Sequence, residues 1–94
     1  MDESIHNPVA RGDVVGTVER SDGSRVADAA VAVVSGPAAW PEITHLSNRN
    51  GEFNLAELTA GRWWLRARAP DGASGEVGVQ VKENEIASVS ITLR

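Results

Sequence analysis

The sequence predicts an all-β protein, a small antiparallel β-sandwich of about seven short strands. Three observations support this class. Short segments in which apolar and polar residues alternate recur along the chain, as expected for half-buried strands. Turn residues separate these segments by roughly 8–12 residues, a spacing typical of sandwiches and small barrels. Valine, whose branched side chain suits a pleated sheet, is frequent in the segments, and no stretch has convincing helical periodicity.

The N-terminal third of the chain is expected to hold two strands. Residues 1–12 lack periodicity and are interpreted as a flexible tail in front of a domain at 13–94. The first strand, 13–19, alternates strictly and ends at a Ser-Asp-Gly-Ser turn. The second strand, 29–35, is apolar on both faces, which indicates a central position in a sheet.

The middle of the chain is expected to hold two further strands. A loop with two prolines leads to a third strand at 43–48, and a fourth follows at 52–55. Asn50 and Gly51 lie between them and favour a hairpin turn. The segment 56–59 is expected to form at most one loose turn.

The C-terminal third is expected to hold the last three strands, at 62–69, 74–82 and 86–94. Turn residues at 70–72 and 83–85 separate them. In the last two strands valine, isoleucine or leucine alternates with polar residues, which predicts one apolar face for each strand.

Length, charge and cysteine content limit the function. Ninety-four residues make one domain, and the formal net charge of −4 argues against a nucleic-acid partner, which requires a clustered positive field. The absence of cysteine excludes disulfides, thiolate nucleophiles and cysteine metal sites. No apolar run approaches the ~20 residues that span a bilayer, so membrane insertion is not expected.

The sequence leaves the cellular compartment open. The first eleven residues have neither the basic region nor the apolar core of a signal peptide. The protein is expected to be cytoplasmic if the chain is complete, and extracellular or periplasmic if it is excised from a longer exported protein. The chain stops where the last strand ends, which slightly favours an excised module.

Several motifs follow one another in a specific order after residue 12. They are Gly16-x-Val18, Asp22-Gly23, Val26-x-Asp28-Ala29-x-Val31-x-Val33, Ser47-Asn48-x-Asn50-Gly51-x-Phe53-x-Leu55, Leu58-x-x-Gly61-x-Trp63-x-Leu65-x-Ala67 and Val89-x-Ile91-x-Leu93. In these motifs the chain resembles the carboxypeptidase regulatory-like domains, with their transthyretin-like (prealbumin-like) and Cna-B-type relatives. The resemblance implies a seven-stranded Greek-key sandwich, with Trp63 in the core where the family usually has tyrosine. It also implies an accessory, spacer or interaction module, in many cases on an exported protein.

The reactive groups of the active relatives are missing from the chain. An internal isopeptide bond needs a lysine in the first strand and an asparagine or aspartate in the last, whereas the only lysine is Lys82. The transthyretin-like hydrolases use several histidines and a tyrosine; this chain has His6, His45 and no tyrosine. Neither histidine begins the zinc-binding His-x-x-Glu motif of metallocarboxypeptidases. The acidic residues lack the dense spacing of a calcium site. We therefore expect no enzyme activity, no catalytic residue, no metal and no cofactor.

The strand at 62–69 supplies the best candidate binding surface. If Trp63 and its alternate neighbours face the core, four residues face outward: Arg62, Trp64, Arg66 and Arg68. An exposed tryptophan among arginines is typical of a protein interface, and its ring could also stack on a sugar. The alternative is structural: Trp64 lies over Gly78, with Arg66 and Arg68 stacked or paired with Glu76.

Two further features have structural and binding interpretations. Trp40, in the loop before the third strand, either closes one end of the sandwich or contacts a partner. Ala30, Ala32 and Val34 form an apolar stripe, near Val15 if the first two strands pair. The stripe reflects either small residues in a central strand or an interface with a second copy or a neighbouring domain.

The sequence therefore predicts a non-catalytic structural or protein-interaction module that is an accessory domain. Its partner is expected to be a protein or a neighbouring domain of a larger chain, with weak self-association as a further possibility. The alternative is a carbohydrate-binding module that uses Trp64 and Trp40.

Overall fold

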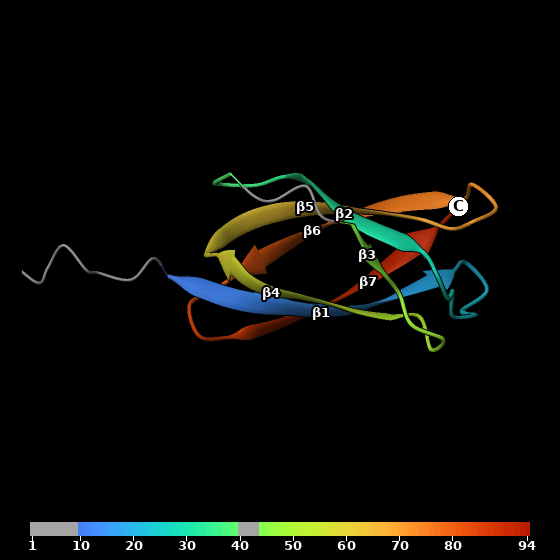
Figure 1. Ribbon diagram of the computed structural model, residues 1–94, viewed down its shortest axis with the longest axis horizontal. Helices are drawn as coiled ribbons and strands as arrows, with labels where there is room; N and C mark the ends of the chain where they lie inside the picture. The colour runs from blue at the N-terminus through green and yellow to red at the C-terminus, as the bar shows by residue number, and fades with distance from the viewer. Residues whose placement is uncertain (1–9, 40–43) are drawn as a thin grey trace, which may run out of the picture.

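The computed structural model describes residues 10–39 and 44–94, and this part of the chain contains seven strands and no helix (Figure 1). The strands are β1 (Arg11–Arg20), β2 (Ala30–Ser35), β3 (His45–Leu46), β4 (Glu52–Thr59), β5 (Gly61–Arg68), β6 (Ser74–Val81) and β7 (Ile86–Leu93). The predicted all-β class and the seven-strand pattern are confirmed.

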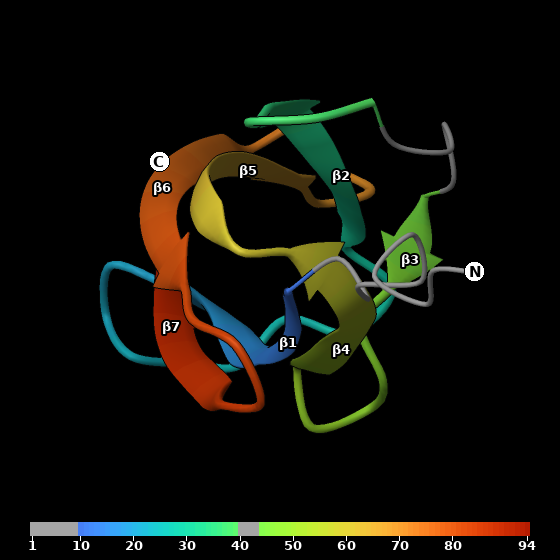
Figure 2. The same ribbon diagram turned by 90° about the vertical axis from the view of Figure 1, so that its left-hand side faces the viewer.

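The strands form two sheets that pack face to face (Figures 1 and 2). One sheet has the order β4-β1-β7 and the other has the order β3-β2-β5-β6. Four strand pairings are antiparallel, as expected, and the pairing of β1 with β7 is parallel. Nearly the whole domain separates β1 from β7 in sequence, which allows the long connection that parallel neighbours require.

Two strand boundaries differ from the predicted ones because of one irregularity in the β1–β4 ladder. Gly12 pairs with Leu58 and Val14 pairs with Leu55, so β4 carries an extra residue at this point. Glu57 adopts a left-handed φ of 57° there, and its backbone N–H donates to Asp13 Oδ1 at 2.9 Å. This bulge lets β4 continue through 56–59, where a loose turn was expected, and lets β1 begin two residues earlier.

Other expectations are corrected or lie outside the described residues. The first two predicted strands do not pair, since β1 and β2 belong to different sheets, and Val15 is therefore not a neighbour of the β2 stripe. Of the third predicted strand, 43–48, only the two residues of β3 pair with a neighbouring strand within the described residues. Residue 43 of that predicted strand and most of the predicted tail at 1–12 lie outside the described residues.

The core lies between the two sheets, and its two aromatic side chains pack against glycines. Phe53 and Trp63 are 5% and 1% exposed, as expected for core residues. A Cβ atom at Gly16 would collide with the Phe53 ring, and one at Gly36 would collide with the Trp63 ring. The Trp63 Nε1–H also donates to the backbone oxygen of Thr59 at 2.6 Å. The sheets therefore accommodate large rings where a neighbouring strand or loop lacks a side chain.

The two long sides of the sandwich are closed to different degrees. On one side, β6 and β7 lie side by side (Figure 2). A Cβ atom at Gly75 would collide with the backbone oxygen of Thr92, and the Arg94 N–H donates to Ser74 O at 3.0 Å. On the other side stand the short β3 and the edge strand β4, which belong to different sheets.

A buried serine connects the segment before β4 to the segment before β2. The Ser47 hydroxyl accepts the Ala29 backbone N–H at 2.9 Å and donates to Val26 O at 2.7 Å. Ser47 is 2% exposed, and it is the only buried polar residue in the described part of the chain. Its hydroxyl therefore satisfies two backbone groups that water does not reach.

The turn that follows Ser47 explains the predicted Asn-Gly signal. Asn48 Oδ1 accepts the backbone N–H groups of Asn50 and Glu52, each at 2.9 Å. Gly51 has a φ of 74°, a left-handed conformation that glycine adopts without strain. The turn carries the chain from one sheet to the other instead of closing a hairpin within one sheet.

Replacing the Ser47 hydroxyl tests its role in joining the segments. We expect Ser47→Ala to lower the free energy of unfolding by about 1–3 kcal/mol, because it leaves a buried donor and a buried acceptor unsatisfied. Urea denaturation followed by circular dichroism measures the effect. Ser90→Ala is the control, since the Ser90 hydroxyl bonds to Thr17 on the exposed face, and we expect a change within about 0.5 kcal/mol. Equal losses in both variants would contradict this role for Ser47.

The adjacent tryptophans of β5 are expected to differ sharply in their contribution to stability. Trp63 is buried and Trp64 is 43% exposed, because successive side chains of a strand point to opposite faces. We expect Trp63→Ala to lower the free energy of unfolding, measured by urea denaturation, by about 3–5 kcal/mol. Trp64→Ala should lower it by about 1 kcal/mol or less. Trp63→Phe offers a milder core variant if Trp63→Ala does not fold. A larger cost for Trp64→Ala than for Trp63→Phe would show that the two faces are misassigned.

Candidate functional site

The outward side of the four-stranded sheet contains four of the five predicted partner-binding residues. We call it the outer face and define it by the residues Ala30, Ala32, Val34, Ser35, Leu46, Arg62, Trp64, Arg66, Arg68, Ser74, Glu76, Gly78 and Gln80. The register of β5 with β6 places Trp64 beside Gly78 and Arg66 beside Glu76. Trp40, the fifth predicted residue, lies outside the described residues.

Trp64 lies over Gly78. A Cβ atom at Gly78 would stand 3.1 Å from both Cζ3 and Cη2 of the indole and 3.2 Å from Arg62 Nη1. The ring therefore covers a place on β6 that has no side chain, as the structural alternative proposed. Trp64 nevertheless remains 43% exposed, so covering Gly78 leaves much of the indole accessible to solvent.

The arginines of the outer face differ in their partners. Arg66 forms an ion pair with Glu76, in which Nε donates to Oε2 at 2.9 Å and Nη2 donates to the same oxygen. Within the described residues, neither Arg62 nor Arg68 has a carboxylate within ion-pair distance. The outer face thus carries three guanidinium groups and one carboxylate.

Exposed apolar side chains gather on the same face. Four large apolar residues are exposed in the described part of the chain, and three of them belong to the outer face: Val34 at 41%, Leu46 at 63% and Trp64 at 43%. Ala30 pairs with Leu46 on one side and with Arg68 on the other, so the apolar stripe of β2 continues onto β3. Sequence analysis did not single out Leu46, because its position depends on the pairing of β3 with β2.

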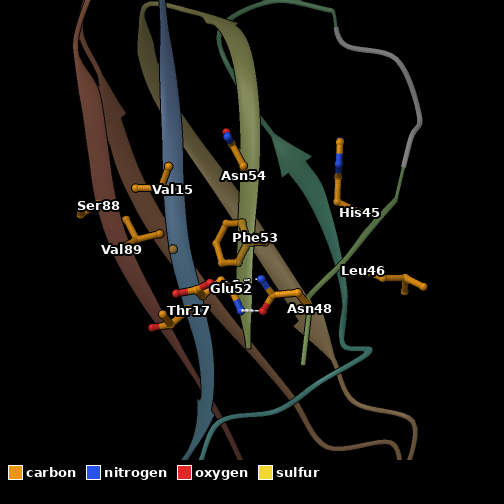
Figure 3. Close-up of a pocket in the computed structure, with 11 residues that line it drawn as sticks. Val15, Thr17, His45, Leu46, Asn48, Glu52, Phe53, Asn54, Ser88 and Val89 are labelled. Carbon is orange, nitrogen blue, oxygen red and sulfur yellow. Dashed lines mark hydrogen bonds between the residues drawn. The ribbon is translucent and has the colours of Figure 1, made fainter. Parts of the chain in front are cut away.

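An open groove of about 690 Å³ lies on the side of the sandwich where β3 and β4 stand (Figure 3). His45 and Leu46 of β3 contribute to its lining, as do Phe53 and Asn54 of β4. Its volume is in the range of ligand pockets. Sequence analysis did not find this groove, since it arises where the chain passes from one sheet to the other.

The groove residues do not form a recognisable reactive set. The Asn48 side-chain amide donates to Glu52 Oε1 at 3.1 Å, so these two polar groups of the lining are engaged with each other. In residues 10–39 and 44–94 no three histidine or acidic side chains come together in a way that would hold a metal ion. The same residues contain no helix able to cross a membrane.

Two aspartates with perturbed acidity lie at turns. A hydrogen bond from the Ser24 backbone N–H lowers the pKa of Asp22, and one from the Ala73 backbone N–H lowers the pKa of Asp71. Asp71 also pairs with Arg20 at 2.9 Å. Both carboxylates therefore stabilise turns, and neither belongs to the outer face.

Solved structures with a similar fold come from bacterial proteins. The TIE protein of Bacillus anthracis matches with a TM-score of 0.71 and 16% identity over 89% of this chain and 16% of that one. A streptococcal ancillary pilin matches with a TM-score of 0.66 and 19% identity over 92% of this chain and 30% of the pilin. A putative carbohydrate binding protein of Pseudomonas aeruginosa matches with a TM-score of 0.62 and 14% identity over 89% of both chains. This chain thus spans less than a third of the first two proteins.

Sequence comparison gives a family but no characterised relative. No curated protein matches the chain. The family model of the carboxypeptidase regulatory-like domain matches residues 13–94, which is most of the sequence. The sandwich topology and this match lead to one conclusion: the chain belongs to the carboxypeptidase regulatory-like domain family.

Proposed function

We propose that the chain is a non-catalytic accessory domain that contacts a protein partner, or a neighbouring domain of a larger chain, through its outer face. One observation carries the proposal: three of the four large apolar side chains exposed in the described residues lie on this face, together with three arginines. Tryptophan and arginine are enriched where proteins contact each other, and tryptophan often dominates the binding energy.

The residues that face the core support a non-catalytic role. The buried positions of β1 are occupied by Val14 and Val18, and those of β7 by Ile91 and Leu93. These strands therefore offer neither the lysine nor the asparagine or aspartate that an isopeptide bond joins. His45 is exposed on β3, and within the described residues it belongs to no group of three histidine or acidic side chains that could hold a metal ion.

The comparisons support an accessory role. Two of the matching structures are much longer than this chain, which spans 16% of one and 30% of the other. Inter-domain contacts within such chains resemble transient protein interfaces. A neighbouring domain is therefore as suitable an occupant of the outer face as a separate protein.

Carbohydrate binding is the second candidate, and the accessible indole of Trp64 favours it. One of the matching structures is described as a putative carbohydrate binding protein. A glycan array probed with the wild-type domain and with Trp64→Ala separates the two functions. We expect no saturable glycan binding. Saturable binding that disappears in Trp64→Ala would replace the proposed function with carbohydrate recognition.

Site-specific photocrosslinking in the organism that produces the protein tests the proposed contact surface. We expect a photoreactive residue at Gln80, an exposed position of the outer face beside Arg62, to form crosslinks to a partner or to another domain of the same chain. The control places the same residue at Ser90, an exposed position on the opposite sheet. Mass spectrometry identifies the crosslinked segment. Equal crosslinking from both positions, or none from Gln80, would contradict the proposal.

A further inference from the structure

We propose that the partner of the outer face is a short acidic segment of a protein, whose carboxylates bind Arg62 and Arg68 on either side of an apolar side chain that packs against Trp64. This inference rests on the proposed function and adds the chemistry of the partner. It commits to an acidic protein segment rather than to a second copy of this chain, a long polyanion or a glycan.

The charge of the outer face differs from that of the chain. The whole chain has a formal net charge of −4. On the outer face, β2 and β3 contribute only uncharged residues, β5 contributes three arginines, and β6 contributes one carboxylate, Glu76. Glu76 is taken by Arg66, which leaves Arg62 and Arg68 without a carboxylate in the described residues. A complementary partner must therefore supply negative charge.

The same charge argues against face-to-face pairing of two copies. Stacking one outer face on another would bring guanidinium groups against guanidinium groups, with only Glu76 from each copy to balance them. Like charges placed opposite one another across an interface cost several kcal/mol and suppress the wrong partner. The self-association that the apolar stripe of β2 suggested is thus opposed by the arginines beside it.

The spacing along β5 sets the shape of the acidic segment. Residues that alternate along a strand lie about 6.6–6.8 Å apart, so Arg62 lies one such step from Trp64 and Arg68 lies two steps away on the other side. The matching segment has two carboxylates roughly 20 Å apart, with an apolar group nearer to one of them. An extended peptide with acidic residues at its first and seventh positions and an apolar residue at its third fulfils this pattern. Guanidinium groups suit the role because they bind carboxylates through two parallel hydrogen bonds.

The surroundings of the face favour a short segment over a long polyanion. Beyond the Arg62 end of β5 lies the β6–β7 turn, which carries Glu83 and Glu85 together with Lys82. Beyond the Arg68 end lies the turn that carries Asp71, whose carboxylate pairs with Arg20. A nucleic acid or an acidic polysaccharide that extended past the Arg62 end would meet two carboxylates and only one ammonium group. A glycan would also leave the aliphatic side chains of Val34 and Leu46 without apolar cover.

The test is a titration of the isotope-labelled chain with a designed peptide, followed by backbone amide chemical shifts. The probe is a blocked seven-residue peptide with glutamate at its first and seventh positions, leucine at its third, and serine or glycine elsewhere. The matched control peptide has glutamine in place of both glutamates. We expect saturable shifts in the amides of β2 and β5, and on the order of tenfold weaker binding of the glutamine peptide.

Charge-reversal variants locate the binding. Arg62→Glu and Arg68→Glu should each weaken the binding of the acidic peptide by about fivefold or more. The control is Arg49→Glu, which changes the net charge by the same amount at an exposed position on the Asn48–Gly51 turn. We expect this variant to bind like the wild type. Because these side chains are exposed, the spread of amide shifts should show that all three variants fold.

Four results would overturn the inference. One is the absence of saturable shifts up to millimolar peptide, and another is an equal effect of Arg49→Glu, which would indicate non-specific attraction. The third is tighter binding of a sulfated oligosaccharide than of the acidic peptide. Crosslinking from Gln80 to a partner segment without acidic residues would also overturn it, while the proposed contact surface would stand. Specific binding of the peptide without any crosslink from Gln80 would instead reject the proposed function and retain the acidic chemistry.

Discussion

The alternation of side chains along β5 is the constraint on which both the core and the outer face depend. This strand is paired on both edges, with β2 on one side and β6 on the other, so its register is fixed by two ladders. Trp63 therefore enters the core and Trp64 lies outside. A slip by one residue would turn every side chain over and bury arginines in place of Trp63, Leu65 and Ala67. The same hydrogen bonds that hold the core thus hold three guanidinium groups in a row on the surface.

Glycines leave room for the large aromatic rings of this sandwich, whose other core residues have small or medium-sized side chains. Each large aromatic ring in the described residues lies where a facing residue has no side chain. The pairs are Phe53 with Gly16, Trp63 with Gly36 and Trp64 with Gly78. In the first two pairs the missing Cβ admits a ring into the core, and in the third it lets an indole lie against the sheet from outside. The outer aromatic is therefore part of the packing scheme as well as a candidate contact.

Local pattern was sufficient to predict the last three strands. The family resemblance implied the core position of Trp63, from which the outward direction of the arginines follows. The features that sequence analysis missed depend on pairing between distant segments. The parallel β1–β7 ladder follows from which strands become neighbours, and the extension of β4 follows from the contact of Asp13 with Glu57. Likewise, Leu46 joins the apolar stripe only because β3 pairs with Ala30. These contacts produce no periodic pattern in the sequence. Neither the turn residues nor the alternation of apolar and polar residues could therefore predict them.

Packing explains some residues of the outer face and leaves others without a structural role. Trp64 covers Gly78, and Arg66 pairs with Glu76, although an exposed ion pair of this kind contributes only about 0–1 kcal/mol. Arg62 and Arg68 gain no ion pair in the described residues, and the exposed parts of Val34 and Leu46 gain no cover. The outward positions of the opposite sheet include more polar residues, among them Asp13, Thr17, Ser88 and Ser90, together with Val15 and the exposed Ile86. The proposed contact with a partner therefore rests on the combination of three exposed apolar side chains with two arginines that have no carboxylate partner in the described residues.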